Sequence, residues 1–453
     1  MKSYDVIMIG TGQATGTMLP EFLKMGLWVA VVEKELVGGT CMNWGCTPTK
    51  TLVAGARAAH MVRRAGDFGV NVTDFQIDFA KAMERQQKNR EASSKGFEDW
   101  LREVTDFYRA EAHFVGPDRV SVGEKTIQGK TIYIHTGATA RVPAIPGIDT
   151  VDYLDNKKIL SLSERPEHLV VVGGSYIGLE FSQIFRRFGS KVTVLERGPR
   201  IMSREDDDVA AEAHRILSDE GIEILRNVDV KSVSDKDGVT VNIEENGVTK
   251  TVTGSHILLA TGRVPQTAAL NLEAAGIETN NRGFIEVDEY LRTTAPNVYA
   301  VGDVNGRSAF THTSVHDGQV IIKNLRGENW RVSDRTTIYS MFIDPPLGRV
   351  GISEAQAKKS GREVLKGTMP MSKIARAREK DETAGLVKVL VDAHTGQVLG
   401  ATVFGTGGDE VINMFAAWMQ TRLPYTELQK VVMVHPTVSE LMPYVFENLE
   451  PLS

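Results

Sequence analysis

Two segments of this sequence repeat one pattern: a β-rich strand, a glycine turn, a helix and a second strand that ends in an acid. In the first segment, YDVIMIG leads through GTGQATG and TMLPEFLKMG to WVAVVE, and Gly10 lies 23 residues before Glu33. The second is HLVVVGGSYIGLEFSQIFRRFGSKVTVLER, in which Gly173 again lies 23 residues before Glu196. Such a unit binds a dinucleotide, because the pyrophosphate rests on the helix N-terminus. The repeat therefore predicts an α/β protein with two Rossmann-like dinucleotide-binding domains.

The glycines of the first unit have separate tasks. Gly10 permits the tight turn, and Gly12 lets the backbone approach a pyrophosphate closely. Glu33 is then expected to reach the ribose hydroxyls on the adenine side. The third glycine of the pattern would fall at position 15, where the chain has Thr15, with Gly16 one residue late. The packing of this helix against its strand must therefore accommodate a side chain.

The second unit indicates which nucleotide binds. Gly173, Ser175 and Gly178 occupy its fingerprint positions, with serine in place of the second glycine. Glu196 suits a free 2′-hydroxyl and would repel a 2′-phosphate, so NADH is favoured over NADPH. The nearby Arg197 leaves NADPH possible, as does Arg200 in the same loop. The alternative, two ordinary strand–helix–strand turns without a ligand, is weakened by the equal spacing of the two units.

Both cysteines of the chain lie in the single stretch GGTCMNWGCTPTK, residues 38–50. A zinc site normally takes four ligands from two such pairs, and no second pair exists, so no metal site is predicted. A helix that begins near Pro48 and the charge of Lys50 would both lower the pKa of a nearby thiol. Cys41 and Cys46 are therefore predicted to carry out redox chemistry.

The composition limits the setting in which this chemistry takes place. At 453 residues the chain is long enough for several domains, and its net charge of −6 does not favour nucleic acid or an anionic membrane. No run of about 18 apolar residues, the length that spans a membrane, occurs in the sequence. Two cysteines cannot make a secreted disulfide framework, so the cytoplasm is the expected location.

Three further stretches mark where the chain passes between domains. IYIHTGATARVPAIPG and HILLATGRVPQT each contain a strand, a Thr-Gly turn and then proline, which is typical of a crossover. NVYAVGDVNG is an apolar strand that runs into Gly302 and Asp303. An aspartate at such a strand end either accepts hydrogen bonds from a ribityl chain or forms a turn.

With these motifs in order, the sequence resembles the pyridine nucleotide–disulfide oxidoreductases, the flavoenzyme family of dihydrolipoamide dehydrogenase, glutathione reductase and mercuric reductase. The N-terminal glycine motif, GGTCMNWGCTPTK, GGSYIGLE, ATGRVP, VYAVGD and HPTVSE carry the resemblance over almost the whole chain. It implies an FAD domain in two segments (1–147 and 268–335), an NAD(P) domain (148–267) and a C-terminal α+β dimerisation domain (336–453). The homodimer would share its active sites between subunits.

The resemblance also implies roles for individual residues. Cys41 would attack the substrate, Cys46 would face the flavin as a charge-transfer thiolate, and Tyr176 would cover the nicotinamide side. Lys50 would pair with Glu180 beside the flavin. The residues that match FAD contacts are Gly10, Gly12, Glu33, Gly39, Thr40, Lys50, Thr136, Gly137, Gly302 and Asp303. Those that match NAD contacts are Gly173, Ser175, Tyr176, Ile177, Gly178, Glu196 and Gly262.

A His–Glu pair near the C-terminus is the expected source of protons. His435 has an unperturbed pKa near neutrality, and Glu440 is placed to orient its imidazole. The resemblance implies that both residues reach across the dimer into the partner's active site. Without the cysteine pair and Glu440, His435 would be read as a turn residue.

The predicted function is the transfer of a hydride from NADH to FAD, then to the Cys41–Cys46 disulfide, and finally to a small disulfide or thiol-bound metal or oxidant. The C-terminal EPLS contains no cysteine, so the mercuric-reductase-like branch without a C-terminal cysteine pair fits best. Dihydrolipoamide dehydrogenase is an alternative, although Met433 replaces a histidine usual there. A redox-sensing flavoprotein with little turnover is another. Trp44 departs from the family pattern and either narrows the access channel or packs against the flavin domain.

Overall fold

The first domain of the computed structural model, which describes residues 1–235 and 238–452, is built on a seven-stranded sheet. Its strand order is β3-β2-β1-β6-β5-β4, with β16 also paired to β6. The strands are β1 Lys2–Ile9, β2 Val29–Glu33, β3 Asp106–Arg109, β4 Ala112–Gly116, β5 Arg119–Val122, β6 Lys125–Ile134 and β16 Val298–Ala300. β1, β2, β3, β6 and β16 run parallel, and their apolar runs are buried because helices cover the sheet.

A second parallel sheet follows, in the order β10-β9-β8-β14. Its strands are β8 His168–Val172, β9 Lys191–Leu195, β10 Glu223–Leu225 and β14 His256–Leu259. An antiparallel sheet of β11 Val228–Asp235, β12 Val239–Glu245 and β13 Val248–Gly254 lies beside it. The chain thus contains two doubly wound units, as the repeated motif predicts.

The chain passes between these two units at one place. β7 Ala138–Ala140 and β15 Arg263–Pro265 pair antiparallel, so the outgoing and returning segments lie side by side. These are the two stretches in which the sequence predicts crossovers.

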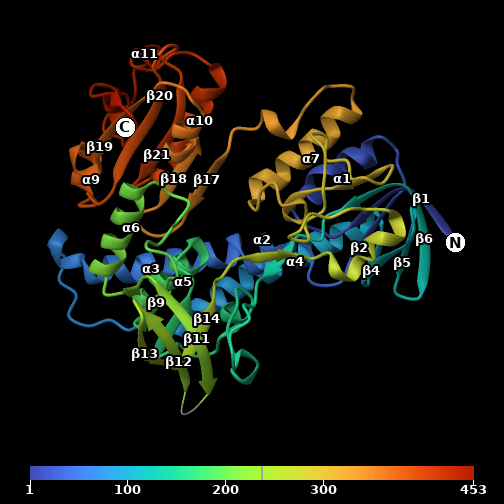
Figure 1. The fold of residues 1–453 in the computed structure, drawn as a ribbon, viewed down its shortest axis with the longest axis horizontal. Coiled ribbons are helices and arrows are strands. Elements are labelled where there is room, and N and C mark those ends of the chain that lie inside the picture. Colours follow the sequence, from blue (N-terminus) through green and yellow to red (C-terminus); the bar gives the residue numbers. More distant parts are fainter. Residues whose placement is uncertain (236–237, 453) are drawn as a thin grey trace.

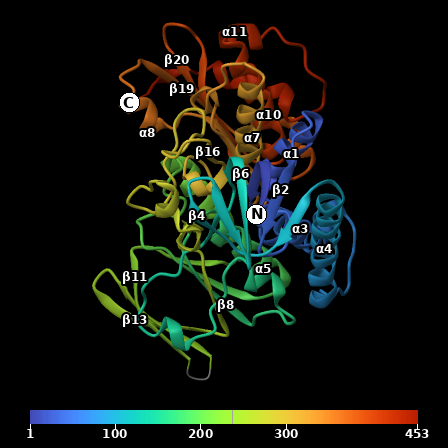
Figure 2. The same ribbon diagram turned by 90° about the vertical axis from the view of Figure 1, so that its right-hand side faces the viewer.

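The C-terminal part is a six-stranded antiparallel sheet in the order β17-β18-β21-β20-β19-β22. Its strands are β17 Ile338–Met341, β18 Leu347–Gly351, β19 Val364–Pro370, β20 Leu386–Asp392, β21 Val398–Phe404 and β22 Glu450–Pro451. Figures 1 and 2 show this part at one end of the molecule and β11–β13 at the other.

The helices lie over and between these sheets. They are α1 Gln13–Lys24, α2 Gly39–Trp44, α3 Cys46–Arg63, α4 Phe79–Val104, α5 Tyr176–Phe188, α6 Asp207–Asp219, α7 Thr311–Leu325, α8 Glu354–Lys359, α9 Ala375–Glu379, α10 Gly408–Thr421 and α11 Tyr425–Leu428. α3 packs on both α4 and α5, and one buried cluster joins Leu52 of α3, Phe185 of α5 and Leu347 of β18. The apolar core therefore holds all three parts together around the helix that begins at Cys46. No helix among the described residues is both long and apolar enough to cross a membrane.

Candidate active site

The two cysteines lie on two consecutive helices. Cys41 is in α2, and Cys46 is the first residue of α3. Both are free thiols, and Cys46 Sγ lies 3.2 Å from Thr311 Oγ1 at the start of α7. Three elements, α2, α3 and α7, therefore meet at this sulfur.

The surroundings shift the pKa values of the two thiols in opposite directions. The pKa of Cys46 is lowered to about 6, mainly because the Cys41 thiol donates a hydrogen bond to it. The Thr311 hydroxyl and the charge of Lys50 lower this pKa further, whereas burial opposes the shift. The same interaction with Cys46, and then burial, raises the pKa of Cys41. The position of Cys46 at the N-terminus of α3 also favours the anion. In the reduced pair the negative charge thus resides on Cys46.

An ion pair connects this helix to the second dinucleotide unit. Lys50 Nζ lies 2.8 Å from Glu180 Oε2, and so joins α3 to α5. The backbone N–H of Phe342 donates to the other Glu180 oxygen at 2.7 Å, and the Lys50 ammonium lies 4.6 Å from the centre of the Phe342 ring. The predicted pair of Lys50 and Glu180 is therefore present.

The N-terminus of α1 has the shape that a dinucleotide requires. A Cβ atom on Gly12 would lie 2.6 Å from the ring of His135, and one on Gly39 would lie 2.9 Å from Gly12 Cα. Gly10 has φ +103°, and a Cβ there would lie 2.2 Å from the His135 carbonyl oxygen. A side chain at Gly10 or Gly12 would therefore meet the strand end at His135, and one at Gly39 would meet Gly12 itself, so the backbone can approach a phosphate here only because these three residues are glycine. The turn therefore fits the pyrophosphate of FAD.

Glu33 lies at the end of β2 with its carboxylate facing this turn. Its Oε2 accepts hydrogen bonds from the Thr11 N–H at 3.1 Å and the Thr11 hydroxyl at 2.7 Å. The acid is thereby held beside the glycines.

Thr15, the departure from the glycine pattern, is accommodated by a histidine that sequence reasoning missed. Its hydroxyl donates to the Gly10 carbonyl at 3.0 Å and lies 3.2 Å from His135 Nδ1. The other ring nitrogen of His135 lies 3.0 Å from Ser314 Oγ. Burial lowers the pKa of His135 to about 4, so the ring is neutral at pH 7 and ties β6, α1 and α7 together. The signal was a histidine at the end of the apolar strand in IYIHTG.

An arginine that was not anticipated from the sequence contacts two of the residues predicted to bind FAD. Arg263 lies 3.2 Å from Asp303 Oδ2 and 3.3 Å from Thr40 Oγ1, and also donates to the Ala138 carbonyl. Burial raises the pKa of Asp303, whereas the charge of Arg263 opposes that rise. Thr136 and Gly137 both bond to Gln266 in the adjacent crossover, and the Gly302 N–H donates to Asp317.

The glycine turn before α5 is equally tight. A Cβ on Gly178 would lie 2.2 Å from the Gly173 carbonyl oxygen, and Ser175, at the N-cap position, is exposed. Ile177 is also exposed, and Gly262 has φ +112° next to β15. Glu196 accepts from the N–H groups of Gly174 and Gly198, both at 2.7 Å. The acid again faces its glycine turn.

Trp44 packs between α4 of the first domain and the segment around residues 156–157, which follows the first crossover. Its ring lies 4.7 Å from the Arg90 guanidinium of α4 and 5.7 Å from the Lys157 ammonium. Its carbonyl accepts from Asn156 at 2.9 Å. The contact with Arg90 favours the interpretation in which Trp44 packs against the flavin domain, and the other two contacts extend that packing to the next segment.

His435 and Glu440 form the expected pair, but apart from the cysteines. His435 Nδ1 lies 2.9 and 3.0 Å from the two oxygens of Glu440, and the histidine side chain is 74% exposed. In the described part of the chain, no side-chain hydrogen bond joins His435 to Cys41 or Cys46. One subunit alone does not assemble all the predicted catalytic residues.

Comparisons with known proteins agree with this arrangement. Residues 4–318 match the family described as pyridine nucleotide-disulphide oxidoreductase, and residues 337–445 match the dimerisation domain of that family. A protein of Escherichia coli strain K12, described as probable pyridine nucleotide-disulfide oxidoreductase RclA, is 37% identical over 98% of this chain and 99% of its own. A mercuric reductase of Bacillus cereus is 32% identical over 96% of this chain and 70% of its own.

Two further comparisons extend this result. A dihydrolipoyl dehydrogenase of Geobacillus stearothermophilus is 31% identical over 96% of this chain and 94% of its own. A solved structure, described as the Cu(II) complex of HOCl-induced flavoprotein disulfide reductase RclA from Escherichia coli, superposes with a TM-score of 0.90 at 36% identity and covers 99% of both chains. The chain therefore belongs to the pyridine nucleotide-disulfide oxidoreductase family, whose members work with a flavin and NAD(P)H.

Proposed function

We propose that this protein is an FAD-dependent NADH:disulfide oxidoreductase in which Cys41 and Cys46 form the redox pair. The observation that carries the proposal is the Lys50–Glu180 ion pair. It joins the helix that begins at Cys46 to the helix that begins at the second dinucleotide turn. The second dinucleotide turn on one side and the thiol pair on the other thus lie next to one charged pair.

The overall reaction is the two-electron reduction of an external disulfide by NADH and one proton, which yields NAD⁺ and two thiols. FAD, when bound, accepts the hydride and passes two electrons to a disulfide. Cys41, which holds its proton in the resting pair, gives that proton to His435 as its sulfur attacks the acceptor disulfide and expels one thiolate. Cys46, whose pKa is lowered, then attacks the Cys41 sulfur of the mixed disulfide, expels the second thiolate and re-forms the Cys41–Cys46 disulfide. Lys50 stabilises the Cys46 thiolate. His435, oriented by Glu440, supplies the proton to the departing thiol.

The surroundings of Glu196 support NADH over NADPH. Its two oxygens are held by backbone N–H groups, which leaves a fixed negative charge where a 2′-phosphate would lie. The nearby Arg197 lies 4.0 Å from Asp229, and Arg200 is paired with Asp207. Both arginines are thus partly neutralised, which weakens their attraction for a 2′-phosphate. NADPH stays the second choice.

We further propose that the acceptor is a small disulfide or a thiol-bound metal ion or oxidant. The relatives support this, because they include mercuric reductases and a flavoprotein reductase whose structure is described as a Cu(II) complex. The proposed assembly is a cytoplasmic homodimer, with the domain boundaries given above and with His435 serving the partner's thiols. Dihydrolipoamide dehydrogenase is the second candidate, favoured by the relative of that name.

The test is stopped-flow reduction of the purified holoenzyme by NADH, followed by mixing with a panel of acceptors. We expect rapid bleaching of the flavin and a long-wavelength band from the Cys46 thiolate. A disulfide, Cu(II) or a thiol-bound Hg(II) should then reoxidise the protein, and Cys41→Ser should abolish turnover. Absence of bound flavin, or no reduction by NADH, would contradict the proposal. Turnover of dihydrolipoamide with NAD⁺ at a rate above all other acceptors would favour the second candidate, and negligible turnover with every acceptor would favour a redox sensor.

A further inference from the structure

A buried carboxylate connects the second dinucleotide turn to the C-terminal sheet. The side chain of Glu205, just before α6, is 0% exposed. It accepts hydrogen bonds from the Tyr176 hydroxyl, from the Tyr339 hydroxyl at 2.6 Å and from Arg349 at 2.8 Å. Tyr176 and Tyr339 share one oxygen, and Arg349 binds the other. Glu205 and its C-terminal partners have no part in the reaction proposed above.

The protonation states of these groups make Glu205 the acceptor. Burial, followed by the charge of Glu205, raises the pKa of Tyr176 and of Tyr339 above the ordinary tyrosine value. Both phenols are therefore neutral donors at pH 7. A buried carboxylate that receives two phenols and a guanidinium is well satisfied, and loss of any one donor has a cost.

Tyr176 lies between the second glycine turn and the Lys50–Glu180 pair. It is the first residue of α5, directly after that turn, and one helical turn before Glu180. Its ring lies 5.8 Å from that of Tyr339, which stacks at 5.3 Å on Phe310, the residue before Thr311. A nucleotide that extends from the glycine turn toward the Lys50–Glu180 pair meets this ring first.

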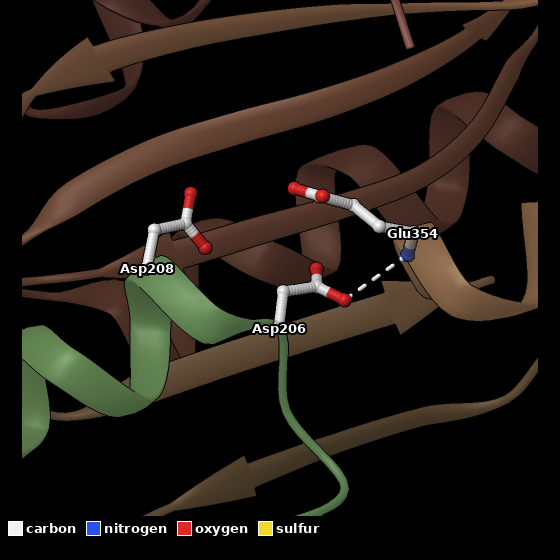
Figure 3. Close-up of side chains that lie close together, drawn as sticks. All are labelled: Asp206, Asp208 and Glu354. Atoms are coloured by element: carbon white, nitrogen blue, oxygen red, sulfur yellow. Dashed lines mark hydrogen bonds between the residues drawn. The ribbon is translucent and has the colours of Figure 1, made fainter. Parts of the chain in front are cut away.

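Glu205 is held in place by further contacts, so its carboxylate cannot move together with the Tyr176 ring. Arg349 also contacts Asp206 at 3.3 Å, and Asp206 contacts Lys388 of β20 at 2.9 Å. Figure 3 shows Asp206, Asp208 and Glu354 converging, and Lys388 Nζ lies 2.6 Å from Asp208 and 2.8 Å from Glu354. The lysine ammonium occupies the position that a cation would take among these acids. The cluster therefore pins the start of α6 to the C-terminal sheet.

We propose that Glu205 is a positioning residue that holds the Tyr176 ring across the nicotinamide path and thereby sets the affinity for NADH. The proposal rests on the proposed function. Entry of the nicotinamide moves the ring and breaks its hydrogen bond, so that Glu205 keeps two of its three donors. The apparent dissociation constant equals the intrinsic one divided by the fraction of molecules with the ring displaced. A stronger hydrogen bond to Glu205 thus means weaker apparent binding.

The test is the apparent dissociation constant of NADH, taken from the concentration dependence of flavin reduction in stopped flow. Tyr176→Phe keeps the ring and removes the hydrogen bond, and should lower the constant by about three- to tenfold, which corresponds to a modest charge-assisted hydrogen bond. Glu205→Gln should lower it as well. The double variant should show little more than either single change, because both remove the same bond.

Two tyrosine variants separate positioning from general loosening. Tyr339→Phe removes the competing donor on the same oxygen and keeps the ring, so NADH affinity should stay unchanged or weaken. Tyr153→Phe, a hydroxyl deletion outside this network, should match the wild type. In Glu205→Gln, Tyr339→Phe and Tyr153→Phe, reoxidation by 5,5′-dithiobis(2-nitrobenzoate) should be unchanged. Flavin content and thermal midpoint identify any variant that fails to fold, and if Glu205→Gln fails, Tyr176→Phe and Tyr339→Phe decide alone.

Three results would overturn the proposal: an unchanged constant in Tyr176→Phe, additive effects in the double variant, or an equal fall in Tyr339→Phe. They differ from failure of the proposed function itself, in which NADH does not reduce the wild-type flavin. Reduction of the wild type with an unchanged Tyr176→Phe variant would remove the role of Glu205 and leave the disulfide reductase in place.

Discussion

At the scale of single residues, the thiol pair is asymmetric although its two members are chemically identical. Cys46 heads a helix and is close to Lys50, and its pKa falls to about 6 mainly because the Cys41 thiol donates to it. Cys41 keeps its proton for the same reason. The thiolate is thereby fixed on the sulfur that also contacts Thr311 at the start of α7.

This asymmetry predicts a titration. In the reduced wild type, the long-wavelength absorbance of the Cys46 thiolate should be present above about pH 6 and lost as the pH falls below that value. Cys41→Ala removes the hydrogen-bond donor, so the midpoint should move upward. Cys41→Ser keeps a hydroxyl donor, so its midpoint should move less. The measurement is the long-wavelength absorbance of each variant between pH 4 and pH 10. The midpoints of the two variants should differ by on the order of one pH unit.

Equal midpoints for Cys41→Ala and Cys41→Ser would show that Cys41 does not act as a donor. A larger upward shift of the midpoint in Cys41→Ser than in Cys41→Ala would show that the charge of Lys50, and not a hydrogen bond from Cys41, is the main cause of the low pKa of Cys46.

At the scale of elements, the first dinucleotide turn depends on how closely α1 approaches the end of β6. Gly12 is the N-cap of α1 with φ −67°, a conformation open to any residue. Its need for glycine is steric, because a Cβ there would lie 2.6 Å from the His135 ring. Gly16, four residues on, has only Phe97 near its Cβ position, at 3.8 Å. A side chain is therefore excluded at Gly12 but can be accommodated at Gly16.

We expect Gly12→Ala to purify with little or no bound flavin, because the Cβ displaces His135 and with it the turn that receives the pyrophosphate. Gly16→Ala should keep full flavin content and should be more stable by about 0.5–1 kcal/mol, since alanine is the better helix former. The ratio of flavin to protein absorbance and the thermal midpoint test both. Normal flavin content in Gly12→Ala would argue against the proposed FAD site.

At the scale of the whole molecule, one buried cluster around α3 joins the three parts, yet the proposed proton donor faces outward. His435 is 74% exposed, and Glu440 is 12% exposed. The neighbouring Val432 and Val434 are also exposed, at 96% and 76%. An exposed apolar segment that carries an oriented histidine suits a surface completed by a second copy of the chain.

Mixed dimers should test this arrangement. Cys41→Ser and His435→Gln should each be nearly inactive toward disulfides. Random reassociation of equal amounts makes half of the dimers mixed, and each mixed dimer has one site with both Cys41 and the partner's histidine. Activity should therefore return to about a quarter of the wild-type value. The matched control, Cys41→Ser with Cys46→Ser, should restore nothing, and an equal lack of recovery in both mixtures would indicate that each subunit completes its own site.

The sequence by itself determined the two dinucleotide units, the grouping of both cysteines with Lys50, and the two stretches in which the chain crosses between units. These depend on local spacing, since turn geometry, helix start and strand length are set by residues only a few positions apart. Only the tertiary structure decided the contacts that bring distant segments together. Glu205 meets Tyr339, 134 residues later, and His135 meets Ser314, 179 residues later. Such pairings arise because elements from distant parts of the chain pack against one another. The spacing of residues along one strand or helix does not indicate which distant side chain will be buried beside it.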